Sequence, residues 1–135
     1  MRILHVNKFV YRRGGAEAYM LDLAHAQSAR GDEVELFGMH HPDNEASRFS
    51  PWFPGEVDFN STDLRGRAAA VGRMVWSSTA KRGIEEVLRV HRPHVAHLHN
   101  IYHHLSPSIL GAIARSGVPI VLTLHDYKLV CPSYQ

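Results

Sequence analysis

Histidine is the most conspicuous side chain capable of chemistry in this sequence. The chain contains eleven histidines, and five of them fall between positions 97 and 125. Near neutral pH an imidazole can donate or accept a hydrogen bond, relay a proton or bind a metal ion. His125 stands directly before Asp126, at the end of the apolar run 120–124. We predict that His125 acts on a substrate hydroxyl. The alternative is a histidine that bonds the backbone and only shapes the loop, and Asp126 either orients its ring or caps the following turn.

Four closely spaced histidines raise the alternative of a metal site: His97, His99, His103 and His104. Residues two apart on a strand share a face, so His97 and His99 could both reach one ion, with a third ligand from His125 or Asp126. Spacing alone meets only part of the coordination requirement. Helices bury the faces of a doubly covered sheet, so we favour a hydrogen-bonded core role for His97 and expect no metal.

A pair of glycines, Gly14 and Gly15, precedes the first expected helix. Glycines let a backbone approach an anion closely, and the following helix points its N–H groups and positive dipole end at that anion. The pair occurs in RRGGAE, and neither GxGxxG nor GxxxxGK[ST] is present. The sequence therefore supports neither a nicotinamide site nor a P-loop phosphate site. The simpler alternative for the pair is a tight turn.

Alternating strands and helices must position these residues. Apolar runs predict strands at 3–7, 33–38, 95–99 and 120–124. Helical periodicity predicts a helix over 16–30, helical material from cap candidates at 61–63 as far as 91, and a helix from 106–107 to 115. The first helix should bury Ala16, Met20, Leu23 and Ala24. Gly31, Arg92-Pro93 and Gly117 should end the three helices, Gly83 should divide the second, and 40–62 should form a long loop.

This alternation indicates an α/β fold, namely a Rossmann-like doubly wound parallel sheet with right-handed crossovers. In such a sheet the carboxyl ends of all strands lie at one edge, outside which ligands bind. The polar residues that leave the predicted strands are Asn7, Lys8, His40, His41, His99, Asn100, His125 and Asp126. We expect the fold to bring them, with the glycine pair, to one cleft.

Length and composition fit one globular domain. The chain has 135 residues, of which 44% are hydrophobic and 21% charged. No apolar run approaches the roughly 20 residues of a membrane span, and the first residues lack the apolar stretch of a signal peptide. The single Cys131 excludes an internal disulfide and favours a reducing compartment. The chain reaches Gln135 without a closing helix, so we expect a truncated piece of a larger protein.

The net charge of +2 is too small to predict nucleic-acid binding. Its distribution is uneven, because 32–63 contains eight acids and one base, whereas 64–92 contains seven bases and two acids. The main bases of the second segment, near Trp76, are Arg65, Arg67, Arg73, Lys81, Arg82 and Arg89. They form either a solvated helix face or a contact with an anionic membrane surface.

Two long segments resemble family 4 glycosyltransferases of the GT-B fold. RRGGAEAYMLDLAHAQSARGDEVELFG resembles the opening of that family, and RPHVAHLHNIYHHLSPSILGAIARSGVPIVLTLHDYKLVCP resembles the later part of the same N-terminal domain. The resemblance covers most of the chain and weakens only across 40–62. A glycine pair alone is a weak signal, but the two segments in this order are a strong one.

The resemblance implies that 1–135 form a Rossmann-like N-terminal domain that mainly holds the acceptor, while a C-terminal domain in cis mainly holds a nucleotide-sugar. The acceptor would be a glycan or a lipid-linked molecule, and many relatives build surface polysaccharides. Such enzymes usually retain anomeric configuration, need no metal and have no established protein nucleophile. Stabilising the leaving diphosphate would then be the main catalytic task.

The resemblance also implies roles for individual residues. Gly14 and Gly15 would place backbone amides near the donor diphosphate, and His125 would lie beside the reacting sugar or the acceptor hydroxyl. The acceptor side would include His99, Asn100 and Asp126. We expect a cytoplasmic location, with peripheral contact at the inner face of the membrane as a further hypothesis.

Some features depart from the family pattern. No two glutamates stand eight positions apart, so the E-x7-E motif of the donor domain is missing, and we expect the chain to be inactive alone. The family often has Leu at Gln27 and His at Asp32, and we expect both positions to have little effect on function. The alternative functions are a non-catalytic α/β binding module, which Asn7 and Lys8 disfavour because such modules carry acids there, and a zinc hydrolase.

Overall fold

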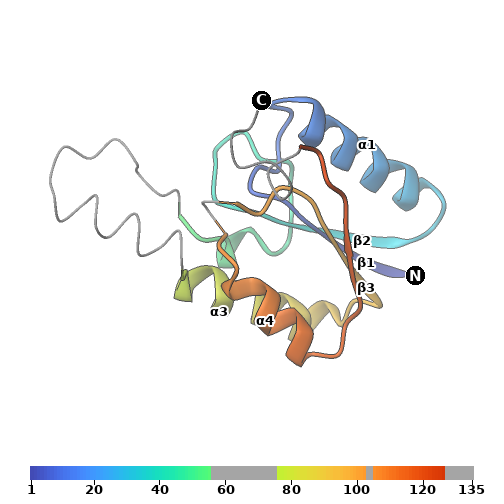
Figure 1. The fold of residues 1–135 in the computed structure, drawn as a ribbon. Coiled ribbons are helices and arrows are strands. Elements are labelled where there is room, and N and C mark those ends of the chain that lie inside the picture. The colour runs from blue at the N-terminus through green and yellow to red at the C-terminus, as the bar shows by residue number, and fades with distance from the viewer. Residues whose placement is uncertain (56–75, 103–104, 127–135) are drawn as a thin grey trace, which may run out of the picture.

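The computed structural model describes residues 1–55, 76–102 and 105–126 of the chain. Its centre is a parallel sheet with four strands, β1 (Arg2–Val6), β2 (Glu33–Phe37), β3 (Val95–Leu98) and β4 (Ile120–Leu122). The strand order is β2-β1-β3-β4, so the chain adds β2 on one side of β1 and then crosses over to add β3 on the other side. The predicted α/β class with a Rossmann-like parallel sheet is confirmed (Figure 1).

Helices cover both faces of the sheet (Figure 1). α1 (Gly15–Ala29) lies on one face, whereas α3 (Ser78–His91) and α4 (Ser108–Arg115) pack together on the other. A short 3-10 helix, η1 (Ser50–Trp52), packs against α3. Because side chains alternate along a strand, buried apolar residues of β1 and β3 face α3 and α4, and the histidines between them face α1. The apolar residues are Leu4, Val6, Ala96 and Leu98.

Each strand ends one or two residues earlier than the sequence predicts. The backbone hydrogen bonds of the sheet nevertheless continue past these ends. The amide of His99 donates to the carbonyl of Val6 at 2.9 Å, and the amide of Thr123 donates to the carbonyl of Leu98 at 2.9 Å. The residues that leave the strands are therefore held by the sheet and not by free loops.

α1 begins and ends one residue earlier than predicted, and its buried face is rotated from the predicted one. The structure buries Glu17, Met20, Leu21 and Ala24. Ala16 and Leu23 are only half-buried, so the prediction for these two residues is wrong. The rotation turns the Glu17 carboxylate inwards, where it accepts a hydrogen bond from a buried strand-end side chain. Gly31 follows the helix with φ +89°, which confirms the predicted stop.

Gly83 does not divide the second helical region, because α3 runs through it without a break. A Cβ at Gly83 would stand 2.1 Å from the carbonyl oxygen of Trp52. The glycine is therefore required for close packing of the segment around η1 against the helix, and not for a bend. The Ser77 hydroxyl caps the start of α3, and Arg92, with φ 48°, ends it as predicted. The cap candidates at 61–63 lie outside the described residues.

α4 begins one residue later than predicted, with Pro107 at its N-cap and not in its first turn. Ser106 has φ +60°, and its hydroxyl accepts a hydrogen bond from the amide of Ser77 at 3.0 Å. This bond ties the start of α4 to the start of α3. Gly117 follows the helix with φ +74°, as predicted.

β4 is one of the two edge strands of the sheet, opposite β2, in the part of the chain that the structure describes. Its side chains are exposed on both faces, by 40% at Ile120, 49% at Val121 and 44% at Leu122. Across the described ranges, no helix combines the length and the apolarity that crossing a membrane requires.

Candidate functional site

The loops that follow β1 and β3 are joined at the carboxyl edge of the sheet. The amide of Lys8 donates to the carbonyl of Asn100 at 2.9 Å, and the amide of Asn100 donates to Oδ1 of Asn7 at 2.9 Å. Asn7 is fully buried, and its Nδ2 donates to the carbonyl of Phe9 and to Oε1 of Glu17. This is the point where the strand order reverses, which is where open α/β sheets bind ligands.

A chain of hydrogen bonds runs through the histidines beside this point. Oε1 of Gln27, on α1, lies 2.7 Å from Nε2 of His5. Nδ1 of His5 lies 3.1 Å from Nε2 of His99, and Nδ1 of His99 lies 2.9 Å from Nε2 of His125. The chain leads from the helix-covered core, where His5 and His99 are 0% and 1% exposed, to the half-buried ring of His125.

His97 lies against this chain without joining it. It stands opposite His5 in the sheet register, and its ring centre is 4.3 Å from that of His99. Its Nε2 bonds Oγ1 of Thr123 at 2.7 Å. The predicted hydrogen-bonded role of His97 is confirmed, although its ring is half-buried and not fully enclosed.

Burial keeps these rings neutral. Together with a smaller effect of the neighbouring histidines, it lowers the pKa of His97 to about 4 and that of His99 to about 3. Burial also lowers the pKa of His5, although the hydrogen bond to Gln27 acts in the opposite direction. Near neutral pH each of these imidazoles therefore carries a single N–H.

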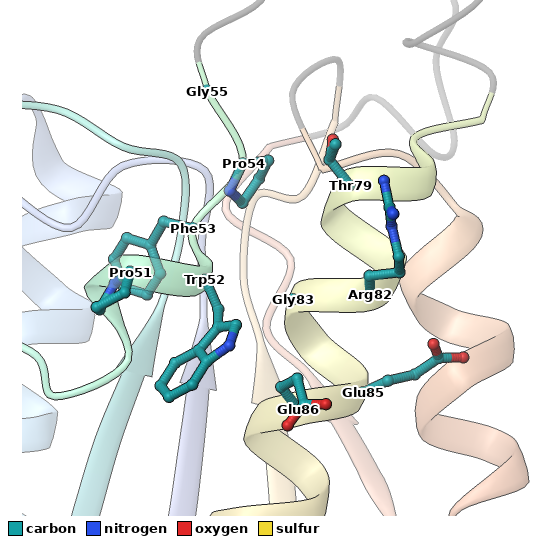
Figure 2. A pocket seen from close by; sticks show the side chains of 10 residues that line it. All are labelled: Pro51, Trp52, Phe53, Pro54, Gly55, Thr79, Arg82, Gly83, Glu85 and Glu86. Carbon is teal, nitrogen blue, oxygen red and sulfur yellow. The ribbon is translucent and has the colours of Figure 1, made fainter.

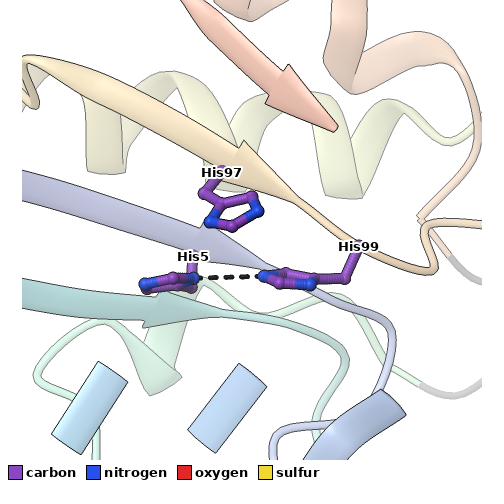
Figure 3. A group of neighbouring side chains, drawn as sticks. All are labelled: His5, His97 and His99. Atoms are coloured by element: carbon purple, nitrogen blue, oxygen red, sulfur yellow. Dashed lines mark hydrogen bonds between the residues drawn. The ribbon is translucent and has the colours of Figure 1, made fainter. Parts of the chain in front are cut away.

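Three of the histidines come close enough to suggest a metal centre. One ring nitrogen from each of His5, His97 and His99 lies within 4.8 Å of the other two (Figure 3). However, His5 and His99 each use both ring nitrogens in hydrogen bonds, and an ion held by all three rings would have to replace bonds of this series. The observed arrangement is a hydrogen-bonded network. His103 and His104 lie outside the described residues.

Gly14 and Gly15 are not in a backbone conformation that requires glycine. Gly14 is extended, with φ −160° and ψ −169°, and neither glycine has a positive φ. The tight-turn explanation therefore does not account for the pair. A Cβ at Gly15 would meet nothing within 4 Å, so the start of α1 borders open space. A ligand can approach the first amides of the helix there.

Similarity to known proteins identifies the family of the domain that contains these residues. Residues 14–134 match the family described as glycosyl transferase 4-like domain. The chain belongs to the glycosyl transferase 4-like family. No curated protein matches the chain closely enough to add a substrate or a partner.

In this glycosyl transferase 4-like domain the start of α1 and His125 lie close together. Tyr19, one turn into α1 from Gly15, places its ring 5.4 Å from the ring of His125 in an edge-on arrangement. The structure thus brings together three of the predicted groups: the glycine pair, the loop of Asn7 and Asn100, and His125 with His99.

Two predicted members are not part of the cluster. His40 is exposed, and its amide bonds the carbonyl of Pro54. His41 stacks on Tyr11 at 4.3 Å between ring centres. Among the described residues neither one contacts the histidine chain, because the segment after β2 turns towards η1 and the loop before α1.

Sequence reasoning missed several residues of the site: His5, Glu17, Tyr19 and Gln27. His5 could have been found, because it stands two positions before Asn7 and would share a sheet face with His97 in a parallel register. Gln27, which was expected to have little effect on function, bonds His5 and is thus in contact with the site. Asp32, by contrast, bonds the terminal amino group of Met1, away from the site.

A hollow of about 440 Å³, separate from the histidines, lies between α3 and the segment 51–55 (Figure 2). Its lining includes Trp52 and, from α3, Arg82, Gly83, Glu85 and Glu86. The two carboxylates are already paired, Glu85 with Lys81 and Arg115, and Glu86 with Arg89. No predicted site residue lines this hollow, so we leave it out of the candidate site.

Proposed function

We propose that this domain is the acceptor side of a retaining glycosyltransferase that moves a sugar from a nucleotide-sugar to a glycan or a lipid-linked acceptor, without a metal. The observation that supports the proposal best is the open space at Gly15, one helical turn from the Tyr19 ring that contacts His125. A donor diphosphate in that space would meet the first amides of α1, where the N-cap residue Gly14 provides no side-chain cap, and the positive end of the α1 dipole.

In this proposal the residues of the cluster have different roles. Gly14 and Gly15 leave room for the diphosphate as negative charge develops on it, and His125 bonds the reacting sugar or the acceptor hydroxyl. His99 is 1% exposed and bonded through both ring nitrogens, so it acts by holding His125 in place. Asn100 and Asp126, both half-buried, form the acceptor-side wall.

The proposal includes a second domain in cis that grips the nucleotide-sugar, in a protein of the cytoplasm or of the inner membrane face. In such an enzyme the present domain alone transfers no sugar. Lys81 and Arg89 pair with acids on α3, so the described part of the basic segment has mixed charge. The peripheral membrane contact therefore depends on the bases between 65 and 73, which lie outside the described residues.

The test uses Gly15→Val in the full-length protein, with Gly55→Val as the matched control. A Cβ at either glycine meets nothing within 4 Å, so both variants should melt near the wild-type temperature. Crowding of the diphosphate should lower kcat/KM for the nucleotide-sugar by about tenfold or more at Gly15 only. Equal kinetics in the two variants would show that the loop merely connects β1 to α1. Ligand binding without transfer for any donor would favour the non-catalytic binding module.

A further inference from the structure

We propose that Gln27 fixes the tautomer of His125 through His5 and His99, so that His125 carries its proton on Nε2 and accepts a substrate hydrogen bond at Nδ1. The inference builds on the proposed function, because it assumes that His125 meets a substrate hydroxyl. Gln27 is then a positioning residue, because its bond to His5 determines whether His125 donates a hydrogen bond to the substrate or accepts one from it.

The amide oxygen of Gln27 sets the direction of the hydrogen bonds in this series. An amide oxygen only accepts hydrogen bonds, so Nε2 of His5, at 2.7 Å, must be the donor. A neutral imidazole has one N–H, and Nδ1 of His5 is then an acceptor. The proton in the 3.1 Å contact must therefore come from Nε2 of His99.

The same step repeats at the next ring. His99 has its proton on Nε2, so its Nδ1 accepts, and the 2.9 Å contact takes its proton from Nε2 of His125. In the neutral form of its ring, His125 is then left with an unprotonated Nδ1. The bond made by one ring nitrogen thus determines the state of the other along the whole series.

All three hydrogen bonds of this series have the same donor-to-acceptor direction only while His5 and His99 stay neutral. The low pKa values of His5 and His99 meet this condition, because neither ring takes up a second proton near neutral pH. Both inner rings are fully buried, so water does not compete for their nitrogens. Gln27 is half-buried on α1 and is the only member of the series that is not a histidine.

The inferred tautomer has a consequence for recognition at the sheet edge. A sugar hydroxyl that donates to Nδ1 of His125 keeps its oxygen lone pairs directed away from the ring. Nδ1 has no hydrogen-bond partner among the described residues, and the Tyr19 ring is 5.4 Å from the ring of His125 on the α1 side. His125 is therefore suited to orient a hydroxyl by accepting from it.

The test measures the tautomer directly. In two-dimensional ¹H–¹⁵N spectra of the histidine rings at pH 7.5, a protonated and an unprotonated nitrogen give well separated ¹⁵N shifts. The His125 signals are assigned by their loss in His125→Ala. The wild-type chain should show Nε2 protonated and Nδ1 unprotonated. A proton on Nδ1 of wild-type His125 would overturn the proposal.

Variants at Gln27 test whether this residue fixes the tautomer of His125. Gln27→Leu removes the acceptor, so the His125 nitrogens should move towards the averaged shifts of a mixed tautomer. Gln27→Glu keeps an acceptor oxygen and should restore the wild-type pattern, while Ser28→Ala, on the exposed side of α1, is the control. An unchanged His125 pattern in a folded Gln27→Leu chain would sink the proposal.

A kinetic measurement separates this proposal from the proposed function. In the full-length protein Gln27→Leu should lower kcat of sugar transfer by about tenfold, as loss of an outer partner of a functional histidine typically does, and Gln27→Glu should recover it. If the spectra show the expected tautomers but His125→Ala transfers sugar normally, the role of Gln27 stands and the catalytic role of His125 fails.

Discussion

Lowering the pH from 8 to 5 should destabilise this domain, because His97 and His99 are neutral when folded and charged when unfolded. An unfolded histidine has a pKa of about 6.5, whereas the folded values are about 4 and about 3. Below pH 6.5 the unfolded chain therefore binds more protons than the folded chain. The free energy of unfolding falls as the pH drops through 6.5, and this loss ends only near the folded values.

The size of the effect at pH 5 depends mainly on the unfolded pKa, since both folded values lie below 5. A separation of about 1.5 pH units from 6.5 corresponds to about 2 kcal/mol for each ring, and about 4 kcal/mol for the two. A typical domain has only about 5–15 kcal/mol of stability in total. The expected loss is therefore a large share of what holds the chain folded.

Urea unfolding at pH 8, 7, 6 and 5 measures this loss. His99→Gln keeps a polar side chain but cannot titrate, so its stability should fall by about 2 kcal/mol less than that of the wild type over the same range. His40→Gln, at an exposed position outside the cluster, should show the wild-type dependence. Equal losses in the wild type and in His99→Gln would refute the assignment of the pH dependence to the buried rings.

Three further changes test other parts of the structure. His125→Ala in the full-length enzyme should lower kcat about 100-fold with little change in melting temperature, and a proportional loss of both would make the residue structural. Gly83→Ala should cost about 1–3 kcal/mol in a melting experiment, because its Cβ meets the Trp52 carbonyl, whereas Gly111→Ala meets only the flexible end of Arg115. Sedimentation with anionic vesicles should exceed that with neutral ones and should weaken when the arginines at 65–73 become Gln, each base contributing about 1 kcal/mol. Equal sedimentation with both kinds of vesicle would mean that the basic segment is a solvated helix face and not a membrane contact.

The sheet and the gathering of polar residues at its carboxyl edge could be predicted because each depends on local patterns. Four apolar runs separated by helical periodicity are enough to give the α/β class, and parallel strands place His99, Asn100 and His125 at one edge. The predicted strand ends were too late because the alternation of apolar and polar residues, and single backbone hydrogen bonds such as that of Thr123, continue past the last residues of the strands.

The missed features depend on contacts between distant segments. Gly83 resembles a helix breaker in sequence, and only the approach of the Trp52 carbonyl explains it. The bond between Gln27 and His5 requires the rotation of α1 about its axis, which the burial of Glu17 reveals and which periodicity did not fix. The face of the sheet on which a strand residue lies could be predicted from the alternation, but the helix residue that contacts it, here Gln27, could not.

The outer side of β4 has a consequence for how this chain behaves in a concentrated solution. A strand with one unpaired backbone edge and exposed apolar side chains is a template on which another strand can align. Ile120, Val121 and Leu122 present such a surface in the described part of the chain, and no proline or charge interrupts them. Copies of the chain will therefore tend to join edge to edge as concentration rises, and Val121→Lys should suppress that association.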